Sequence, residues 1–173
     1  TLYWQGGSLV GDNTDMEGFL YPLGDTAPPA ALVLGGGGAS RAVLAGLEKL
    51  GTPNVIVAAR TVPKALPLQK DFNCRAIPWE NRTDALRDMG QGLVVNTTPM
   101  GMHGTSSHES PLPKNAWPRA EEGGYYTVYD IIYNPLETVF LKQARSNGWS
   151  GLNGLDFFIA QGLAQFRLWT GRE

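Results

Sequence analysis

One short glycine-rich stretch limits most strongly what this sequence can fold into. Leu32-Val33-Leu34 is an apolar run typical of a buried strand, and four consecutive glycines, Gly35 to Gly38, follow it directly. Beyond them, apolar residues recur at helical spacing between Val43 and Leu50. The stretch therefore predicts a strand, a tight glycine turn and the start of a helix.

Such a turn is suited to bind the phosphates of a nucleotide. Glycine lets the backbone come close to the ligand, and a helix N-terminus offers free N–H groups and the positive end of the helix dipole. The spacing is a variant of G-x-G-x-x-G with serine in the third position. An ordinary glycine-rich turn is the alternative interpretation. The candidate cofactor-binding residues are Gly35, Gly36, Gly37, Gly38, Ala39 and Ser40.

The segment from Asn54 to Ala59 indicates a second buried strand, rich in β-branched residues. In a nucleotide-binding βαβ unit, an acid at the end of this strand binds the ribose of NAD, whereas an arginine suits the 2′-phosphate of NADP. The sequence has no acid at this point, but it has Arg60, Thr61 and Lys64, which we predict to bind NADP. For Arg60 the alternative is a solvated turn arginine.

Further strands, each running into a loop or turn, are expected within 72–77, 92–99 and 125–135. Helices are expected at 81–89 and 136–147. A last helix opens at 153–156, and its apolar residues wrap much of its circumference, so we expect it to be buried on more than one side. Strands that alternate with helices through short connections predict an α/β fold. It is a Rossmann-like, doubly wound, mostly parallel sheet of about five strands with helices on both faces.

The end of the predicted strand at 92–99 is polar and rich in hydroxyl groups. Asn96, Thr97 and Thr98 follow four apolar or glycine positions directly. Open α/β sheets hold their ligands at such strand ends. We therefore add Asn96, Thr97 and Thr98 to the candidate cofactor-binding residues.

Two patterns precede the glycine stretch. Residues 1–10 indicate a hairpin around a glycine turn. Thr14 and Glu17 fit a capping box at the start of a helix, which would place Asp15 in the first helical turn. A favourable interaction with the helix dipole is therefore one sufficient explanation for Asp15.

Composition excludes several classes of function. The 173 residues carry a net charge of −2, which gives no electrostatic case for nucleic acid or an anionic membrane. No apolar run approaches the ~18 residues of a membrane span. One cysteine, Cys74, fits a reducing compartment, and we expect a cytoplasmic protein. His103, His108 and Glu109 lie in a Ser/Pro-rich loop without metal-ligand spacing, so no metal site is expected.

Six stretches of the sequence together resemble the shikimate dehydrogenase family. They occur in the family's order and extend over nearly the whole chain. The blocks around Asp15, around Asn96 and in the final helix are more specific than the glycine loop. The six stretches are 11–15, 35–42, 60–61, 96–102, 129–135 and 153–156 with 159–162.

The resemblance implies an NADP-dependent oxidoreductase that reversibly reduces 3-dehydroshikimate to shikimate on the route to aromatic amino acids. Its active site would lie in a cleft between two domains. Asp15 matches the family's catalytic aspartate, which also contacts the substrate and works with a lysine. Tyr133 and Gln161 match substrate-binding residues. Gly154 and the backbone near Ile131 match positions beside the nicotinamide, and Arg60 with Thr61 matches a motif that holds the 2′-phosphate.

The resemblance also has departures. The family's substrate domain, which carries the lysine, has no counterpart here, and Ala59 stands where the family has asparagine. We expect residues 1–14 to be a remnant of the substrate domain and 15–153 to be the NADP-binding domain. Residues 154–173 would be a helix that packs back on a substrate domain supplied in cis or in trans. Two alternatives are a quinate/shikimate dehydrogenase that uses NAD and a non-catalytic ligand-sensing module derived from the enzyme.

Overall fold

The computed structural model describes residues 1–104 and 106–172, and for Lys64 the backbone alone. Within these ranges the strands are β1 (Leu2–Gln5), β2 (Ser8–Gly11), β3 (Ala31–Leu34), β4 (Val55–Ala59), β5 (Arg75–Pro78), β6 (Gly92–Asn96), β7 (Tyr126–Asp130) and β8 (Ser150–Leu152). The helices are α1 (Thr14–Leu20), α2 (Gly38–Leu50), α3 (Val62–Asp71), α4 (Arg82–Met89), α5 (Val139–Arg145) and α6 (Gly154–Thr170), with a short 3-10 helix, η1 (Trp79–Asn81).

Six of these described strands form one parallel sheet in the order β5-β4-β3-β6-β7-β8. The chain starts in the middle at β3, moves out to β5, and returns to β6 on the other side of β3. Leu34, at the end of β3, is in register with Ala58 of β4 and with Asn96 of β6. The predicted Rossmann-like, doubly wound fold is confirmed, and the point where the strand order reverses lies between β3 and β6.

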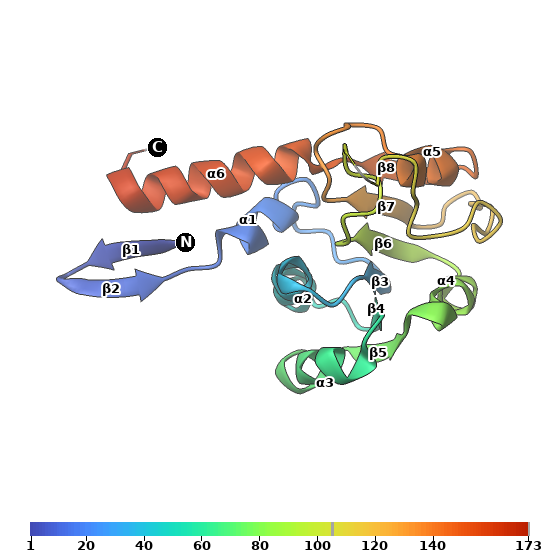
Figure 1. Ribbon diagram of the computed structural model, residues 1–173, viewed down its shortest axis with the longest axis horizontal. Coiled ribbons are helices and arrows are strands. Elements are labelled where there is room, and N and C mark those ends of the chain that lie inside the picture. Colours follow the sequence, from blue (N-terminus) through green and yellow to red (C-terminus); the bar gives the residue numbers. More distant parts are fainter. Residues whose placement is uncertain (105, 173) are drawn as a thin grey trace.

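Helices cover both faces of the sheet, and each face has its own core (Figure 1). Helices α1, α2 and α3 pack on one face, where Phe19, Val43 and Leu68 belong to one buried cluster. Helices α4 and α5 pack on the other, where Leu86 and Phe140 belong to a second cluster. Strand β3 is buried along its whole length because it lies in the centre of the sheet with helices on both sides.

Four elements differ from the sequence prediction, and one of them is α5, which starts at Val139 and not at residue 136. Helix α3 was not predicted, because Pro63, Pro67 and several exposed positions obscure its apolar periodicity. Strand β5 starts at Arg75, three residues later than expected. Strand β8 adds a sixth strand to the expected five or so; it has three residues, too few to show a strand pattern.

Helix α1 is packed tightly between α2 and α6. A Cβ atom added to Gly46 of α2 would lie 2.5 Å from the Phe19 ring of α1. A Cβ on Gly18 of α1 would lie 2.9 Å from Cβ of Gln161 on α6. Below α1, the rings of Phe19 and Tyr129 stack with centroids 5.4 Å apart, which fixes the helix on the sheet. These two glycine notches let three helices approach closely.

The capping box predicted at the start of α1 is wrong. The cap position is Asn13, and no described side chain caps this helix end. Thr14 is buried, and its Oγ1 lies 2.9 Å from Oγ1 of Thr1. The hydroxyl that would have capped the helix is thus used to join α1 to the start of β1. Asp15 does lie in the first turn, as expected.

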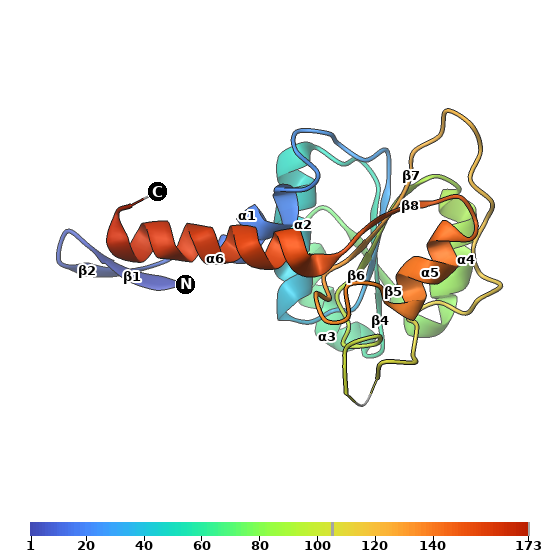
Figure 2. The same cartoon turned by 90° about the horizontal axis from the view of Figure 1, so that it is seen from above.

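The hairpin β1–β2 and helix α6 project away from the sheet side by side (Figures 1 and 2). We call β1, β2 and the part of α6 from Phe158 to Thr170 the arm, and the rest of the molecule the body. Nε1 of Trp169 donates a hydrogen bond of 2.9 Å to the Leu2 carbonyl oxygen, which joins the two parts of the arm. Within the described ranges, no helix is both long enough and apolar enough to cross a membrane.

The prediction that the last helix is buried on more than one side is wrong for this chain. In α6 only Gly154 and Ala164 are classed as buried within the described residues. The large apolar side chains on its outer faces remain in contact with solvent. These are Leu155, Phe158, Ile159, Leu163, Phe166 and Trp169.

Candidate dinucleotide-binding site

A pocket of about 490 Å³ lies at the carboxyl ends of four neighbouring strands. Its walls come from the loop after β3, from the residues that directly follow β4 and β5, and from the loop after β6. This is the position where open α/β sheets hold their ligands. The lining residues are Gly35, Gly36, Gly37, Arg60, Trp79, Thr97, Thr98, Pro99, Met100, Ser106 and Glu109.

The glycine loop forms the floor of this pocket. Gly35 has φ of +116°, and a Cβ there would lie 2.5 Å from Oγ1 of Thr97, so the fold itself requires glycine. Gly37 and Gly38 are different, because an added Cβ would have no described heavy atom within 4 Å. Both are exposed, and the space above them is open. No contact among the described residues therefore requires glycine at these two positions.

Helix α2 begins at this loop with Gly37 as its N-cap residue, and no described side chain caps it. Its first N–H groups have no partner within the helix, so they and the dipole favour an anion. The predicted residue Ser40 is completely buried, and its hydroxyl donates a hydrogen bond of 2.6 Å to the Gly37 carbonyl oxygen. The Ser40 hydroxyl therefore stabilises the glycine turn from inside the protein. Gly38 and Ala39, the first two residues of α2, precede Ser40 in the first turn of the helix.

The loop after β4 brings one positive charge to the pocket. Arg60 is exposed and lines the pocket, as predicted from its place after the second strand of the unit. Thr61 is the exposed N-cap residue of α3 and does not belong to the lining residues that are described. The side chain of Lys64 lies outside what the structure describes. Glu109, which was not among the predicted site residues, also lines the pocket and adds a negative charge.

Asn96 organises the loop after β6 without lining the pocket. Its Nδ2 donates to Oδ1 of Asp130 and to the Met100 carbonyl oxygen, both at 3.1 Å. Its Oδ1 accepts from the backbone N–H and the hydroxyl of Thr98. The side chain is completely buried. Of the three residues predicted here, Thr97 and Thr98 line the pocket, and Asn96 holds them in place.

Asp130 is the buried centre of this network, and it was not among the predicted site residues. Its Oδ2 accepts a hydrogen bond of 2.7 Å from the Thr138 hydroxyl, and its Oδ1 accepts from Ile132 N–H at 3.2 Å as well as from Asn96. Burial raises the pKa of Asp130 to about 6, and the three hydrogen bonds partly oppose that rise. One carboxyl group thus joins the loop after β6, the loop after β7 and the start of α5.

The predicted substrate residues gather where α1 and α6 cross. Gln161 lies against Gly18 of α1, and its Oε1 accepts a 2.6 Å hydrogen bond from Gln165. Nε2 of Gln165 also lies 3.4 Å from Oγ1 of Thr14, the neighbour of Asp15. The Tyr133 ring stacks on Phe158 of α6 with centroids 4.4 Å apart. Gln161 and Tyr133 are therefore both joined to α6, and Asp15 directly follows Thr14, which contacts Gln165 of the same helix.

Gly154 and Ile131 meet at the base of α6. The Gly154 N–H donates a hydrogen bond of 3.0 Å to the Ile132 carbonyl oxygen, and a Cβ on Gly154 would overlap the Ile131 carbonyl group. Gln161 is seven residues further along the helix, about 10 Å away on the same face. One residue of each predicted set, Gly154 for the cofactor and Gln161 for the substrate, therefore lies on the same helix.

Several site residues were missed by sequence reasoning. Trp79, Met100 and Ser106 line the pocket, but they come from a 3-10 helix and an irregular loop whose path no periodicity predicts. Trp79 follows an apolar strand directly, as Arg60 does, and that position was the one available signal. Among the described residues, no group of three His, Cys, Asp or Glu side chains could hold a metal ion.

A doubly wound sheet with a glycine loop at its switch point defines the class of dinucleotide-binding α/β proteins. Comparison with known proteins narrows the class. Residues 154–173 match the family model described as the shikimate 5′-dehydrogenase C-terminal domain. The whole chain is 48% identical over 175 residues to a protein of Oleidesulfovibrio alaskensis named shikimate dehydrogenase (NADP(+)), and it covers 60% of that protein.

Solved structures agree with this result. A shikimate 5-dehydrogenase of Thermus thermophilus, in complex with NADP(H) and shikimate, matches with a TM-score of 0.79 and 37% identity; the match covers 99% of this chain and 61% of that one. A quinate dehydrogenase of Corynebacterium glutamicum, in complex with NAD, matches with a TM-score of 0.81 and 28% identity, over 96% of this chain and 60% of that one. The chain is thus similar over nearly its whole length to members of the shikimate dehydrogenase family, and it spans about 60% of the length of the curated relatives that it matches.

Proposed function

We propose that this chain binds NADP in the pocket at the ends of β3 to β6. The observation that carries the proposal is the open space above Gly37 and Gly38, at the uncapped start of α2. Nothing in the packing of the described residues demands glycine there, whereas a pyrophosphate against the helix N-terminus does. Bound in this way, the group fits the residues present, and its nicotinamide supplies or accepts a hydride.

Arg60 favours NADP over NAD. It follows β4, at the position that faces the ribose of the adenosine half, and its guanidinium can hold a phosphate through two hydrogen bonds. The curated relatives in the comparison are named as NADP(+) enzymes. The quinate dehydrogenase and a shikimate 5-dehydrogenase of Listeria monocytogenes were solved with NAD, so NAD is the competing cofactor. The absence of an acid after β4 in the sequence argues against NAD.

The experiment is calorimetric titration of this chain with NADP⁺ and with NAD⁺. NADP⁺ binding and a weaker response to NAD⁺ are expected. Gly37→Ala should abolish NADP⁺ binding while the protein still folds, because the methyl group occupies ligand space only. Gly162→Ala is the matched control: that glycine also faces open space but lies on α6, away from the pocket. Absence of NADP⁺ binding to the unmodified chain would overturn the proposal.

For the whole protein we propose reversible reduction of 3-dehydroshikimate to shikimate. In that direction the ketone carbon receives a hydride and its oxygen receives a proton. The Asp15 carboxylate can accept a hydrogen bond from the substrate hydroxyl and hold its proton, and Gln161 and Tyr133 lie at the same crossing of α1 and α6 to bind other substrate hydroxyls. Gln161 lies on the same helix as Gly154, the residue that we propose to lie beside the nicotinamide, and this supports a substrate position next to the cofactor.

We further propose that the arm belongs to the contact with a substrate-binding domain. Residues 1–14 would be the end of that substrate-binding domain, and residues 15–153 would be the NADP-binding domain. Residues 154–173 would be a helix that packs on the substrate-binding domain. The exposed apolar side chains of α6 and of the hairpin are suited to be buried against a second folded unit. A cytoplasmic location fits these roles.

This part of the proposal is tested by adding the remaining two fifths of the Oleidesulfovibrio alaskensis relative in trans. Oxidation of NADPH that depends on 3-dehydroshikimate should appear, and Asp15→Asn should remove it. NADP⁺ binding without any such turnover, in a complex shown to form, would favour the ligand-sensing alternative. The intact glycine loop and Asp15 support the enzyme.

A further inference from the structure

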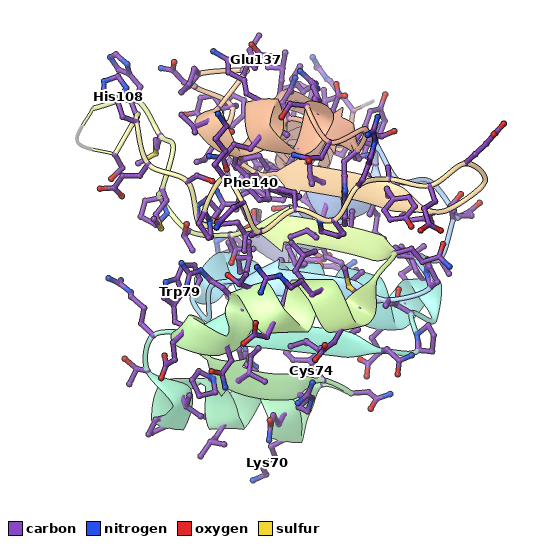
Figure 3. All side chains as sticks on the ribbon, turned by 90° about the vertical axis from the view of Figure 1, so that its right-hand side faces the viewer. Lys70, Cys74, Trp79, His108, Glu137 and Phe140 are labelled. Carbon is purple, nitrogen blue, oxygen red and sulfur yellow. The ribbon has the colours of Figure 1, made fainter. Side chains whose placement is uncertain are left out.

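Trp79 has a place in the pocket that no predicted role explains. It starts η1 directly after β5, is half-buried, and lines the pocket together with Arg60 and Thr98. Figure 3 shows it at the edge of the molecule below the loop that carries His108. It is the aromatic side chain among the lining residues described. A solvent-facing position directly after a strand does not by itself call for an indole.

The indole is held in position by Arg82 at the start of α4. The guanidinium carbon lies 4.4 Å from the Trp79 ring centroid. Nη1 of Arg82 donates a hydrogen bond of 2.8 Å to the Trp79 carbonyl oxygen, and Nε donates one of 2.6 Å to the Pro111 carbonyl oxygen. Arg82 does not belong to the described lining of the pocket, so it supports the indole from outside. The ring is therefore fixed before any ligand arrives, and little conformational entropy is lost on binding.

The order of the strands tells which part of the cofactor reaches Trp79. The glycine loop after β3 is suited to the pyrophosphate, and Arg60 after the adjacent β4 is suited to the 2′-phosphate. β5 is next to β4, so Trp79 lies beyond Arg60 on the side away from β3. The group attached to the phosphorylated ribose is a purine base, which is flat, aromatic and largely apolar. Stacking on an indole is a sequence-tolerant way to bind such a base.

We propose that Trp79 forms the platform on which the adenine base of the dinucleotide stacks, with Arg82 as the residue that positions it. This inference rests on the proposed binding of NADP and deepens it. The ligand class is an adenosine phosphate, of which the base contacts Trp79 and the phosphates contact Arg60 and the glycine loop.

The test uses adenosine 2′,5′-bisphosphate, which carries the base and the phosphates but no nicotinamide. Its affinity for this chain is measured by calorimetry with Trp79→Phe, which keeps an aromatic face, and Trp79→Leu, which keeps apolar volume only. Loss of the stacked base should weaken binding by roughly fivefold to a hundredfold in W79L, while W79F stays close to the unmodified protein. Inorganic pyrophosphate, which has no base, should bind all three proteins equally.

Trp4 provides the matched control, because it is an exposed tryptophan of the arm, far from the pocket in sequence and fold. Trp4→Leu should leave the affinity for the bisphosphate unchanged. If W79L fails to fold, fluorescence of W79F decides: the bisphosphate should quench part of the tryptophan emission of the unmodified chain and of W4L, and none of it in W79F.

The two possible failures are separable. Equal affinity of W79L and the unmodified protein for the bisphosphate, or unchanged quenching in W79F, would overturn the role of Trp79 and leave NADP binding standing. If the unmodified chain binds neither NADP⁺ nor the bisphosphate, the proposed function fails, and the role of Trp79 fails with it.

Discussion

The body and the arm of this molecule differ in the burial of their large apolar side chains. In the body, Phe19, Tyr129 and Phe140 are completely removed from solvent. In the arm, Phe166 is 47% exposed, Trp169 61% and Trp4 73%. Helix α6 has a higher share of large apolar residues than α4, but fewer of them are buried.

The difference shows that the two parts are stabilised by different forces. The body is stabilised by apolar burial on both faces of a parallel sheet. The arm depends on backbone hydrogen bonds within its own elements, on the close packing of α6 against α1 at Gly18, and on hydrogen bonds such as Trp169 to Leu2 and Gln165 to Thr14. The arm carries large apolar side chains of the kind found in protein cores, but these side chains are exposed to solvent. Substitutions should therefore separate the two parts clearly.

The largest effect is expected for Phe19→Ala. Removing this ring leaves a cavity between Tyr129 and the notch at Gly46, so the free energy of unfolding should fall by about 3–5 kcal/mol. Urea denaturation followed by circular dichroism measures it. Phe166→Ala, the matched change in the arm, should cost less than about 1 kcal/mol. Equal losses in the two variants would contradict the division into body and arm.

The next effect concerns binding and should be confined to the body. Arg60→Ala should weaken NADP⁺ binding by roughly 10- to 100-fold, because a charged hydrogen-bonding partner of the phosphate is lost. NAD⁺ binding should hardly change. Two controls are measured in the same calorimetric titrations, and both should bind NADP⁺ like the unmodified chain. They are Leu163→Ser in the arm and Arg75→Ala, which lies at the start of β5, away from the pocket at its carboxyl end. A comparable loss in the arm variant would show that the arm takes part in holding the cofactor.

A third prediction uses pH on the buried carboxyl group of the body. Because the pKa of Asp130 is about 6 in the folded protein and 3.8 is its ordinary value, the folded state keeps its proton at pH values where the unfolded state has lost it. Its contribution to stability is therefore full below the ordinary value and is lost as the pH rises through about 6. Relative to Asp130→Asn, the unmodified protein should gain stability between about pH 7 and about pH 5.

Urea denaturation of both proteins at the two pH values measures this gain. Other titrating groups are common to both, so they cancel in the difference. A difference that does not vary with pH would mean that the Asp130 carboxyl group titrates normally despite its burial.

The smallest effect on stability is expected in the arm. The double variant Phe166→Ser, Trp169→Ser should unfold within about 1 kcal/mol of the unmodified chain, but it should bind clearly less of a fluorescent dye that recognises apolar surface. Leu66→Ser on α3 is the control, since that leucine is equally exposed but isolated on the body. If dye binding depends on Leu66 as much as on the arm, the arm is not a distinct apolar surface.

The body was largely predictable from the sequence because its signals are local. The strand–glycine–helix stretch at Gly35 and the β-branched run before Arg60 each combine apolar period and turn chemistry within a few residues. Helix α3 and strand β8 escaped prediction where prolines or shortness removed the period. Whether α6 is covered could not be predicted, because periodicity reports which residues are apolar and not what lies opposite them.

The residues of the candidate site also divide into those that local sequence patterns predict and those that depend on distant contacts. Arg60 and Thr97 were predictable, since each follows a strand that the pattern identifies. Asp130 and Trp79 were not: the burial of Asp130 arises from pairing of β6 with β7 and from Thr138, and the support of Trp79 comes from Arg82. These contacts join residues that the sequence shows only as separate polar or aromatic positions.

The two glycine notches around α1 have a consequence for motion. Gly46 lets Phe19 pack against α2, and Gly18 lets Gln161 pack against α1, so close contacts hold α1, α2 and α6 together. If the arm contacts a second domain, a hinge movement of that domain would leave α1, α2 and α6 together. The spacing between Gln161 and Gly154 would stay constant throughout such a movement, because both residues belong to the single helix α6.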